Sequence, residues 1–157
     1  MAVQLTDSEI ADLLAERKPL PSGFRTKLVT RPKRGHTERE LDVPGADGSD
    51  FRLILRQSLV NALDFSVILG YRVPSSNQLF RLRRYNGRSH EHTNVIEGDT
   101  FYEFHVHTAT ERYQDEGLRE DAFAVPTDRY SDFEAAQQCM FDDCEFVLPV
   151  DPQDSLF

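Results

Sequence analysis

The chain has 157 residues, and its 27 acidic side chains against 18 basic ones give a net charge of −9 at pH 7. This length predicts a single domain, residues 1–157, which can bury enough apolar surface to fold without a metal ion or a disulfide framework. The negative charge argues against a general nucleic-acid binder, because the neutralisation of phosphates supplies most of the affinity of such proteins.

The charge is unevenly distributed along the chain. Residues 1–114 carry 16 basic and 15 acidic side chains, whereas residues 115–157 carry 2 and 12. We call this last part the acidic C-terminal region. It is a candidate surface for a basic protein partner such as an antitoxin, and the alternative is a solvated face without a partner.

The cysteines and the hydropathy indicate a cytoplasmic protein. Cys139 and Cys144 stand alone, without further cysteines that would build a disulfide framework. No leader peptide and no apolar run of about 18 residues is present, so we expect no membrane association.

The first predicted element is a helix over residues 6–16. Thr6 and Glu9 have the spacing of a capping box, in which each side chain bonds to a backbone N–H group of the other residue. Ile10, Leu13 and Leu14 then form one apolar stripe, and two prolines follow the predicted end of the helix.

The middle of the chain predicts β-structure. Residues 24–35 are basic and are expected to form a strand that leads into an exposed loop. Strands are then predicted over residues 38–43, 51–59, 65–71, 79–85 and 100–110, separated by turn-rich segments. A last helix is expected to begin at Ser131, with Glu134 completing a second capping box. The predicted fold class is α+β, with an antiparallel sheet of about five strands flanked by N-terminal and C-terminal helices.

Histidines are the main candidates for chemistry. Four of the five lie within 18 residues as two H-x-H pairs, His90 with His92 and His105 with His107. Alternation along a strand puts His105 and His107 on one face and the apolar residues between them on the core face. The loop that carries the first pair is expected to fold over this polar face, beside Arg81, Arg83 and Tyr85 of the preceding strand.

Three interpretations of this cluster remain open. Zn²⁺ takes three or four imidazole ligands, and Glu91 or Glu103 is then a fourth ligand or a hydrogen-bond partner of a ligand. Alternatively, histidines act as acid and base in RNA cleavage by attack of a 2′-hydroxyl, while arginine stabilises the charged transition state. The third interpretation is a solvated polar face without chemistry.

Two further side chains belong to the candidate site. Tyr113, after the histidine strand, is a candidate acid or base-stacking group, and the alternative is a half-buried edge residue. Arg88, in the turn Gly87-Arg88-Ser89, is a candidate phosphate ligand, and the alternative is an exposed turn residue.

The runs FRLRRYNGRSHEHTN and FYEFHVHTATERYQ resemble the sequence core of the TumE-like toxins of prokaryotic toxin–antitoxin systems, over about residues 78–114. The chain is also similar, over a longer span, to uncharacterised small prokaryotic proteins. The first resemblance implies a small antiparallel-sheet ribonuclease-like protein. It implies roles for the following positions: Arg84, Tyr85, Asn86, His90, His92, His105 and His107.

The sequence therefore predicts a toxin-type endoribonuclease that needs no metal and no cofactor, acting on RNA and controlled by a cognate antitoxin. The predicted catalytic residues are His90, His92, His105, His107, Arg84, Tyr85, Arg88 and Tyr113. Two alternatives stay open: a non-catalytic acidic interaction protein such as an antitoxin, immunity protein or phage-encoded inhibitor, and a zinc-dependent hydrolase that uses the same histidines. A further hypothesis is that the acidic C-terminal region packs near the arginine-rich face and competes with RNA.

Overall fold

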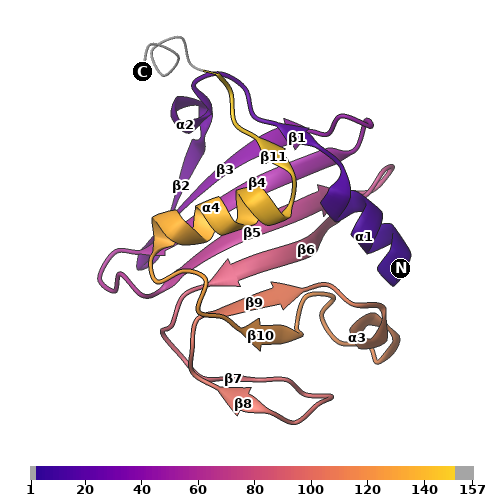
Figure 1. The fold of residues 1–157 in the computed structure, drawn as a ribbon, viewed down its shortest axis with the longest axis vertical. Helices are drawn as coiled ribbons and strands as arrows, with labels where there is room; N and C mark the ends of the chain where they lie inside the picture. The colour runs from indigo at the N-terminus through magenta and orange to yellow at the C-terminus, as the bar shows by residue number, and fades with distance from the viewer. Residues whose placement is uncertain (1–2, 151–157) are drawn as a thin grey trace.

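One large antiparallel sheet forms the centre of the molecule, which the computed structural model describes for residues 3–150. Its seven strands lie in the order β10-β9-β6-β5-β4-β3-β2 (Figure 1). In that order, their bounds are Ala124–Pro126, His105–Thr108, Leu79–Asn86, Phe65–Arg72, Asp50–Ser58, His36–Pro44 and Val29–Lys33. Every pair of neighbouring strands is antiparallel.

The remaining elements surround this sheet. The helices are α1 (Asp7–Ala15), α2 (Phe24–Lys27), α3 (Glu111–Asp115) and α4 (Phe133–Asp143). Two short strand pairs complete the fold: β1 (Lys18–Pro19) pairs with β11 (Phe146–Val147), and β7 (His92–Thr93) pairs with β8 (Thr100–Phe101). Among the described residues, no helix is long and apolar enough to cross a membrane.

The predicted fold class is confirmed, with helices near both ends of the chain and an antiparallel sheet between them. The sheet is larger than five strands. Residues 29–33, within the basic segment expected to form a strand, add one edge strand, and residues 124–126, where no strand was expected, add the other. The strand predicted over residues 100–110 divides into β8 and β9. Residues 24–27 form a short helix instead of the start of a strand, and the apolar side chain of Phe24 is buried there.

The two capping predictions have different outcomes. At the start of α1 the Glu9 N–H donates to the Thr6 hydroxyl and the Thr6 N–H donates to the Glu9 carboxylate, so this capping box is confirmed. The box predicted at Ser131 is wrong. Asp132 is the N-cap of α4, and its carboxylate accepts a hydrogen bond from the Ala135 N–H. An Asp cap satisfies the same free backbone donors one residue later.

The pairing register gives the sheet two different faces. Val106, Tyr85, Val67 and Leu55 are successive partners on β9, β6, β5 and β4, and their side chains pack in the core with the buried residues of α4. Figure 1 shows α4 crossing this face of the sheet. The neighbouring row, on the opposite face, consists of His107, Arg84, Ile68 and Ile54.

A β-bulge in β6 decides which arginines share the face of the histidines. Leu69 pairs with Arg83 and Gly70 pairs with Arg81, so Leu82 is an extra residue without a partner on β5. A bulge reverses the alternation of side chains beyond it. The prediction that Arg83 and Tyr85 lie beside the imidazoles is therefore wrong, and Arg84 and Asn86 take that place.

Gly70 provides the space for this irregular pairing. A Cβ atom at this position would lie 2.8 Å from side-chain atoms of Leu79 on the neighbouring strand. A residue with any side chain would have to displace that leucine. The bulge and the glycine together fix how β5 meets β6.

A buried lysine ties the N-terminal and C-terminal segments together. Lys18 is 0% exposed, and its ammonium nitrogen lies 2.7–3.1 Å from the backbone carbonyl oxygens of Leu13, Leu14, Glu16 and Cys144, so its three N–H groups are shared among four acceptors. Burial lowers the pKa of Lys18 to about 8, which leaves the group charged at neutral pH. The charge is compensated by carbonyl dipoles at the ends of α1 and α4.

We predict that Lys18→Met lowers the free energy of unfolding by about 3 kcal/mol or more, because the carbonyl groups lose a charged donor and stay buried. Urea denaturation measures this loss. The matched variant Lys27→Met, at an exposed position, is expected to stay within about 0.5 kcal/mol of the wild type. Equal stability of the two variants would contradict a structural role for the Lys18 charge.

Candidate metal centre and adjoining pocket

Three histidines meet on the sheet face opposite α4. His105 and His107 come from β9 and are 0% and 4% exposed, while His92 comes from β7, in the hairpin that folds over them. The predicted face and the predicted folding of the loop are both confirmed. The third interpretation, in which the histidines stand on a solvated face, is wrong for His105 and His107, because both rings are buried beneath the β7–β8 hairpin.

The three rings have the spacing of metal ligands. One ring nitrogen from each of His92, His105 and His107 lies within 4.8 Å of the others. The ring centroids are 4.8, 5.0 and 5.4 Å apart. A tetrahedral Zn²⁺ bound at about 2.0–2.1 Å from each nitrogen requires ring centroids about 5 Å apart. The separations of the three rings thus fit those of a zinc site.

Hydrogen bonds to acceptors occupy one nitrogen of each ring. On the second nitrogen a long contact is seen at His105, whose Nε2 atom lies 3.5 Å from the Asn86 side-chain nitrogen. The Nδ1 atom of His105 lies 2.9 Å from the Glu103 carbonyl oxygen, and that of His107 lies 2.8 Å from the Asp121 carbonyl oxygen. In His92 the Nε2 atom lies 2.9 Å from the Asn94 side-chain oxygen. Because all three partners are acceptors, each imidazole must donate there and keep a lone pair on its second nitrogen.

Burial keeps the two strand histidines neutral. It lowers the pKa of His105 to about 4, an effect to which the neighbouring His92 and His90 add. It lowers the pKa of His107 to about 2, with a further contribution from the positive charge of Arg84. A neutral imidazole is the form that binds a metal ion, so these groups need no deprotonation at neutral pH.

Asn94 holds the hairpin in position. Its side-chain oxygen accepts from His92 and from the Ala124 N–H, and its amide group donates to the Ala124 carbonyl at 2.8 Å and to the Asp99 carboxylate. Asn94 is 1% exposed. One amide therefore orients a candidate ligand and joins the hairpin to the edge strand β10.

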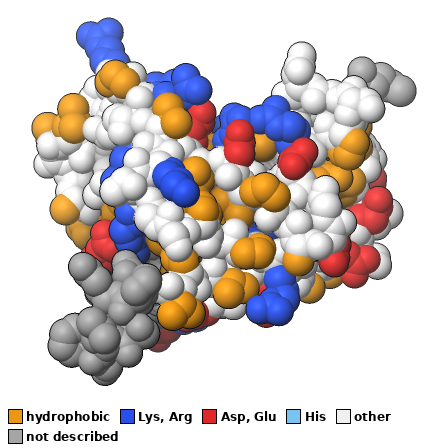
Figure 2. All heavy atoms as spheres, turned by 90° about the horizontal axis from the view of Figure 1, so that it is seen from above, with side chains coloured by type: hydrophobic (Ala, Val, Ile, Leu, Met, Phe, Trp, Pro, Cys, Tyr) orange, Lys and Arg blue, Asp and Glu red, His pale blue; other side chains and the backbone are white. Residues whose placement is uncertain are grey.

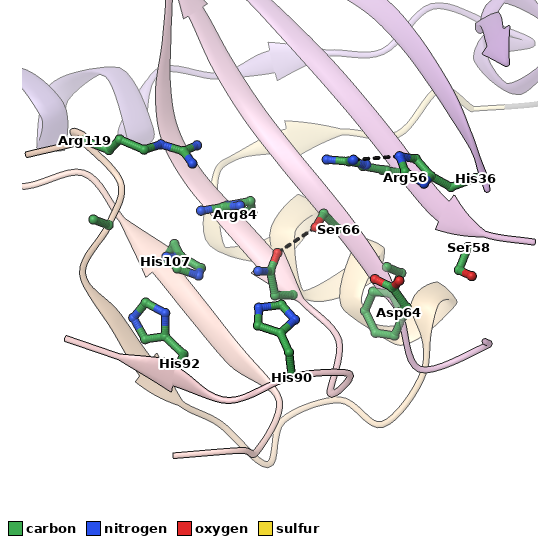
Figure 3. A pocket seen from close by; sticks show the side chains of 13 residues that line it. His36, Arg56, Ser58, Asp64, Ser66, Arg84, His90, His92, His107 and Arg119 are labelled. Atoms are coloured by element: carbon green, nitrogen blue, oxygen red, sulfur yellow. Dashed lines mark hydrogen bonds between the residues drawn. The ribbon is translucent and has the colours of Figure 1, made fainter. Parts of the chain in front are cut away.

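A pocket of about 410 Å³ opens beside the three histidines. Basic or ionisable nitrogen groups dominate its wall, namely those of His36, Arg56, Arg84, His90, His92, His107 and Arg119. Figure 3 shows His92 and His107 at one side of this pocket, Arg56 and His36 at the other, and Arg84 and Ser66 between them. Asp64 contributes a carboxylate to the wall.

The positive charge nearest to His107 is partly compensated by a buried carboxylate. Asp121 is 0% exposed; its oxygens lie 3.3 Å from Arg84 Nε and 3.7 Å from a terminal nitrogen of Arg119. Arg84 itself is held in the row of His107 by the pairing of β6 with β9. This arrangement keeps two guanidinium groups at the wall of the pocket without burying an uncompensated charge.

Comparison of the chain with protein-family models, with curated proteins and with solved structures finds no match. The candidate site therefore rests on the geometry of this chain alone.

The other predicted site residues lie outside the three-histidine cluster. His90 is exposed and lines the pocket, with its ring centroid 6.1 Å from that of His105. Arg88 is exposed, and its guanidinium lies 5.7 Å from the ring centroid of Tyr102. Glu103 bonds to His105 through its backbone carbonyl, not through its carboxylate. The structure thus brings His90 to the pocket and leaves Arg88 at a distance from its wall.

The two predicted tyrosines have buried positions away from the pocket. The Tyr85 hydroxyl donates to the Asp143 carboxylate of α4 at 2.6 Å, on the opposite face of the sheet. The Tyr113 hydroxyl donates to Glu97 at 2.6 Å and ties the β7–β8 hairpin to α3. Both side chains are 0% exposed. Their observed contacts are structural.

Several residues of the site carried no signal in the sequence. Asn94, Asp121, Arg119, Arg56 and His36 come from four separate segments, and none of them belongs to an H-x-H pair. The spacing of Asn94 two residues after His92 was visible, but its bonds to β10 were not. Only the pairing of distant strands reveals these positions.

The acidic side chains of α4 do not lie near the pocket. Asp143 pairs with Arg129 and bonds to Tyr85 on the covered face of the sheet. The masking hypothesis for the acidic C-terminal region is therefore not supported for α4. Asp121, which also belongs to this region, does pack against Arg84 and Arg119 of the pocket wall. Residues 151–157 lie outside the described residues. On the part of the surface seen in Figure 2, acidic, basic and hydrophobic side chains are interspersed.

We predict that metal-free protein binds one Zn²⁺ per chain in a calorimetric titration at pH 7.5. His92→Ala is expected to weaken this binding at least about 100-fold, because a three-ligand site becomes a two-ligand site. His36→Ala, in the same pocket but outside the three-histidine cluster, should bind as the wild type does. Binding that survives His92→Ala unchanged would contradict the proposed ligand set.

We also predict an acid-sensitive stability in the metal-free protein. The pKa values of His105 and His107 lie below the ordinary value of about 6.5, so the unfolded chain takes up their protons first as the pH falls. The stabilisation is complete above pH 6.5 and is lost as the pH falls toward the folded pKa values. Between pH 7 and pH 5 we expect a loss of up to about 2 kcal/mol for each imidazole.

Denaturation curves at several pH values measure this loss. The control is His90→Gln, which removes an exposed imidazole and should keep most of this dependence on pH, because burial is the largest cause of the lowered pKa values. A free energy of unfolding that stays constant from pH 7 to pH 5 would show that the buried rings are not the neutral groups described here.

Proposed function

We propose that this protein is a metal-dependent hydrolase of phosphodiester bonds, with zinc as the favoured ion and RNA as the first substrate to test. The observation that carries this proposal is the set of three clustered histidines, each held by an acceptor on one ring nitrogen, beside an arginine-lined pocket. Zinc hydrolases use three protein ligands and leave one coordination position for water.

The three-histidine cluster and the arginine-lined wall beside it both fit a negatively charged ester as the substrate. A zinc ion held by His92, His105 and His107 would lower the pKa of a bound water molecule to near 7 and so would supply a nucleophile at neutral pH. Arg84 and Arg119 lie beside this position and stabilise negative charge on phosphoryl oxygens as it increases during the reaction. His90, exposed at the same wall, is placed to deliver a proton to the leaving oxygen.

The metal-independent ribonuclease remains the second candidate. It requires one histidine to donate a proton at neutral pH, and the lowered pKa values of His105 and His107 make both rings poor proton donors there. His90 and His36 are more accessible imidazoles at the pocket wall, so this mechanism depends on them. The observed burial therefore favours the zinc alternative over the metal-free one.

The biological setting follows from the resemblance to the TumE-like toxins. We propose that the protein acts in the cytoplasm as the toxin of a toxin–antitoxin pair, and that its antitoxin covers the pocket or binds the acidic C-terminal region. The alternative of a non-catalytic interaction protein predicts a stable complex with a basic partner that survives the loss of all four clustered histidines and weakens with salt.

The test is cleavage of a labelled RNA by untagged protein whose metal content has been measured. We expect cleavage with zinc bound, a loss of at least about 100-fold after chelation, and recovery on adding Zn²⁺. His107→Gln should remove both the metal and the cleavage, and His36→Ala is the control for the metal content. Full cleavage by metal-free protein would instead support the metal-independent ribonuclease.

Growth of a host after induction provides the second measurement. Arrest by the wild type and normal growth with the double variant His105→Ala/His107→Ala would support the toxin assignment. Harmless expression of the wild type would count against it and favour the interaction protein.

A further inference from the structure

The pocket has a second charged end, away from the three histidines. Arg56 lies on β4 and His36 on β3, whereas the buried ligands lie on β9 (Figure 3). Strands β6 and β5 separate β9 from β4, so three strand spacings, about 14 Å along the sheet, separate the two backbones. Both ends face the same cavity of about 410 Å³.

The register explains why Arg56 faces this cavity. Arg56 pairs with Ser66, Ser66 pairs with Asn86, and Asn86 pairs with His105, so the four side chains form one row across the open face of the sheet. The Ser66 hydroxyl donates to the Asn86 side-chain oxygen at 2.8 Å. Ser66 and Asn86, in the middle of the row, are thus neutral and bonded to each other, and Arg56 carries the charge at the end of the row.

Arg56 is an exposed cation without a carboxylate partner. Within the described part of the chain, no acidic oxygen lies within ion-pair distance of its guanidinium. Glu38 is its cross-strand partner on β3, but the Glu38 carboxylate lies 3.8 Å from Lys33. Arg84 and Arg119, in contrast, both approach Asp121. Among the three arginines of this wall, Arg56 is therefore the one whose charge no carboxylate of the described residues shares.

His36 orients this cation. A terminal guanidinium nitrogen of Arg56 donates to the Nε2 atom of His36 at 2.6 Å, which leaves the Nδ1–H group of that imidazole as a further donor. The pair thus presents several N–H donors at one place on the rim. A phosphate group, with its several acceptor oxygens, is the ligand that matches such donors.

We infer that Arg56 and His36 form a second phosphate subsite, which binds a neighbouring phosphate of the same nucleic-acid strand while one phosphodiester lies at the metal centre. This inference rests on the proposed function. It assigns the substrate as a strand with several phosphates, in preference to a small isolated ester. It also makes Arg56 a specificity-determining residue.

The test compares two substrates in the zinc-loaded protein. A short single-stranded RNA carries neighbouring phosphates, and bis(p-nitrophenyl) phosphate carries one phosphodiester only. For Arg56→Gln we expect the ratio of kcat/KM for the RNA to kcat/KM for the small ester to fall about tenfold, mainly through a higher KM for the RNA. Arg17→Gln, an equal loss of charge at an exposed position outside the pocket lining, should keep the wild-type ratio.

Equilibrium binding gives a result that does not depend on cleavage. We expect fluorescence anisotropy of the labelled RNA to show about tenfold weaker binding for Arg56→Gln. The slope of log affinity against log salt concentration should also fall by about 0.7, the value for one phosphate contact on a single strand. A merely structural effect of the substitution would leave this slope unchanged.

The outcomes separate the subsite from the proposed function. Weaker RNA binding with a reduced salt slope supports the subsite, even if the wild type cleaves neither substrate and the hydrolase proposal fails. Cleavage of both substrates with an unchanged ratio and an unchanged slope in Arg56→Gln overturns the subsite and leaves the hydrolase intact. Equal effects of Arg56→Gln and Arg17→Gln would also overturn it, because only net charge would then matter.

Discussion

The antiparallel pairing of β6 with β9 is the constraint on which the site depends. It sets His107 opposite Arg84 and His105 opposite Asn86, so that two imidazoles and an arginine share one face of the sheet. The hydroxyl of Tyr130 lies 2.6 Å from the Asn86 carbonyl and 3.0 Å from the His105 carbonyl, at the point where the two strands meet. A shift of one residue would turn the histidines into the core beneath α4.

The pairing of β6 with β9 places the buried ring of His107 next to the guanidinium of Arg84. This is possible because a nearby carboxylate compensates the charge of the arginine. Asp121 balances Arg84 and Arg119, while its backbone carbonyl accepts the Nδ1–H of His107. One residue therefore orients a candidate ligand and balances the neighbouring cations. The same local compensation is seen at Lys18, where carbonyl groups take the place of a carboxylate.

The covered face of the sheet holds the core, and the open face carries the candidate site. The covered face holds the apolar core and the Tyr85–Asp143–Arg129 contacts, and these join α4 and the segment before it to the sheet. The open face is covered only near its edge, by the β7–β8 hairpin, and this partial cover forms the pocket. Candidate ligands from β9 and from the covering hairpin meet there, so a bound metal ion would also fasten the hairpin to the sheet.

The sequence by itself determined the fold class, the capping of α1 and the face on which His105 and His107 lie. These features depend on local spacing, namely the period of two in a strand and the fixed offsets of a capping box. The partners of the histidines were decided by tertiary structure. The bulge at Leu82 exchanged Arg83 and Tyr85 for Arg84 and Asn86, because one extra residue reverses every side chain beyond it. Other residues reach the site through contacts between distant segments or across several strands, namely Asn94, Asp121 and Arg56. Local sequence patterns do not predict such contacts.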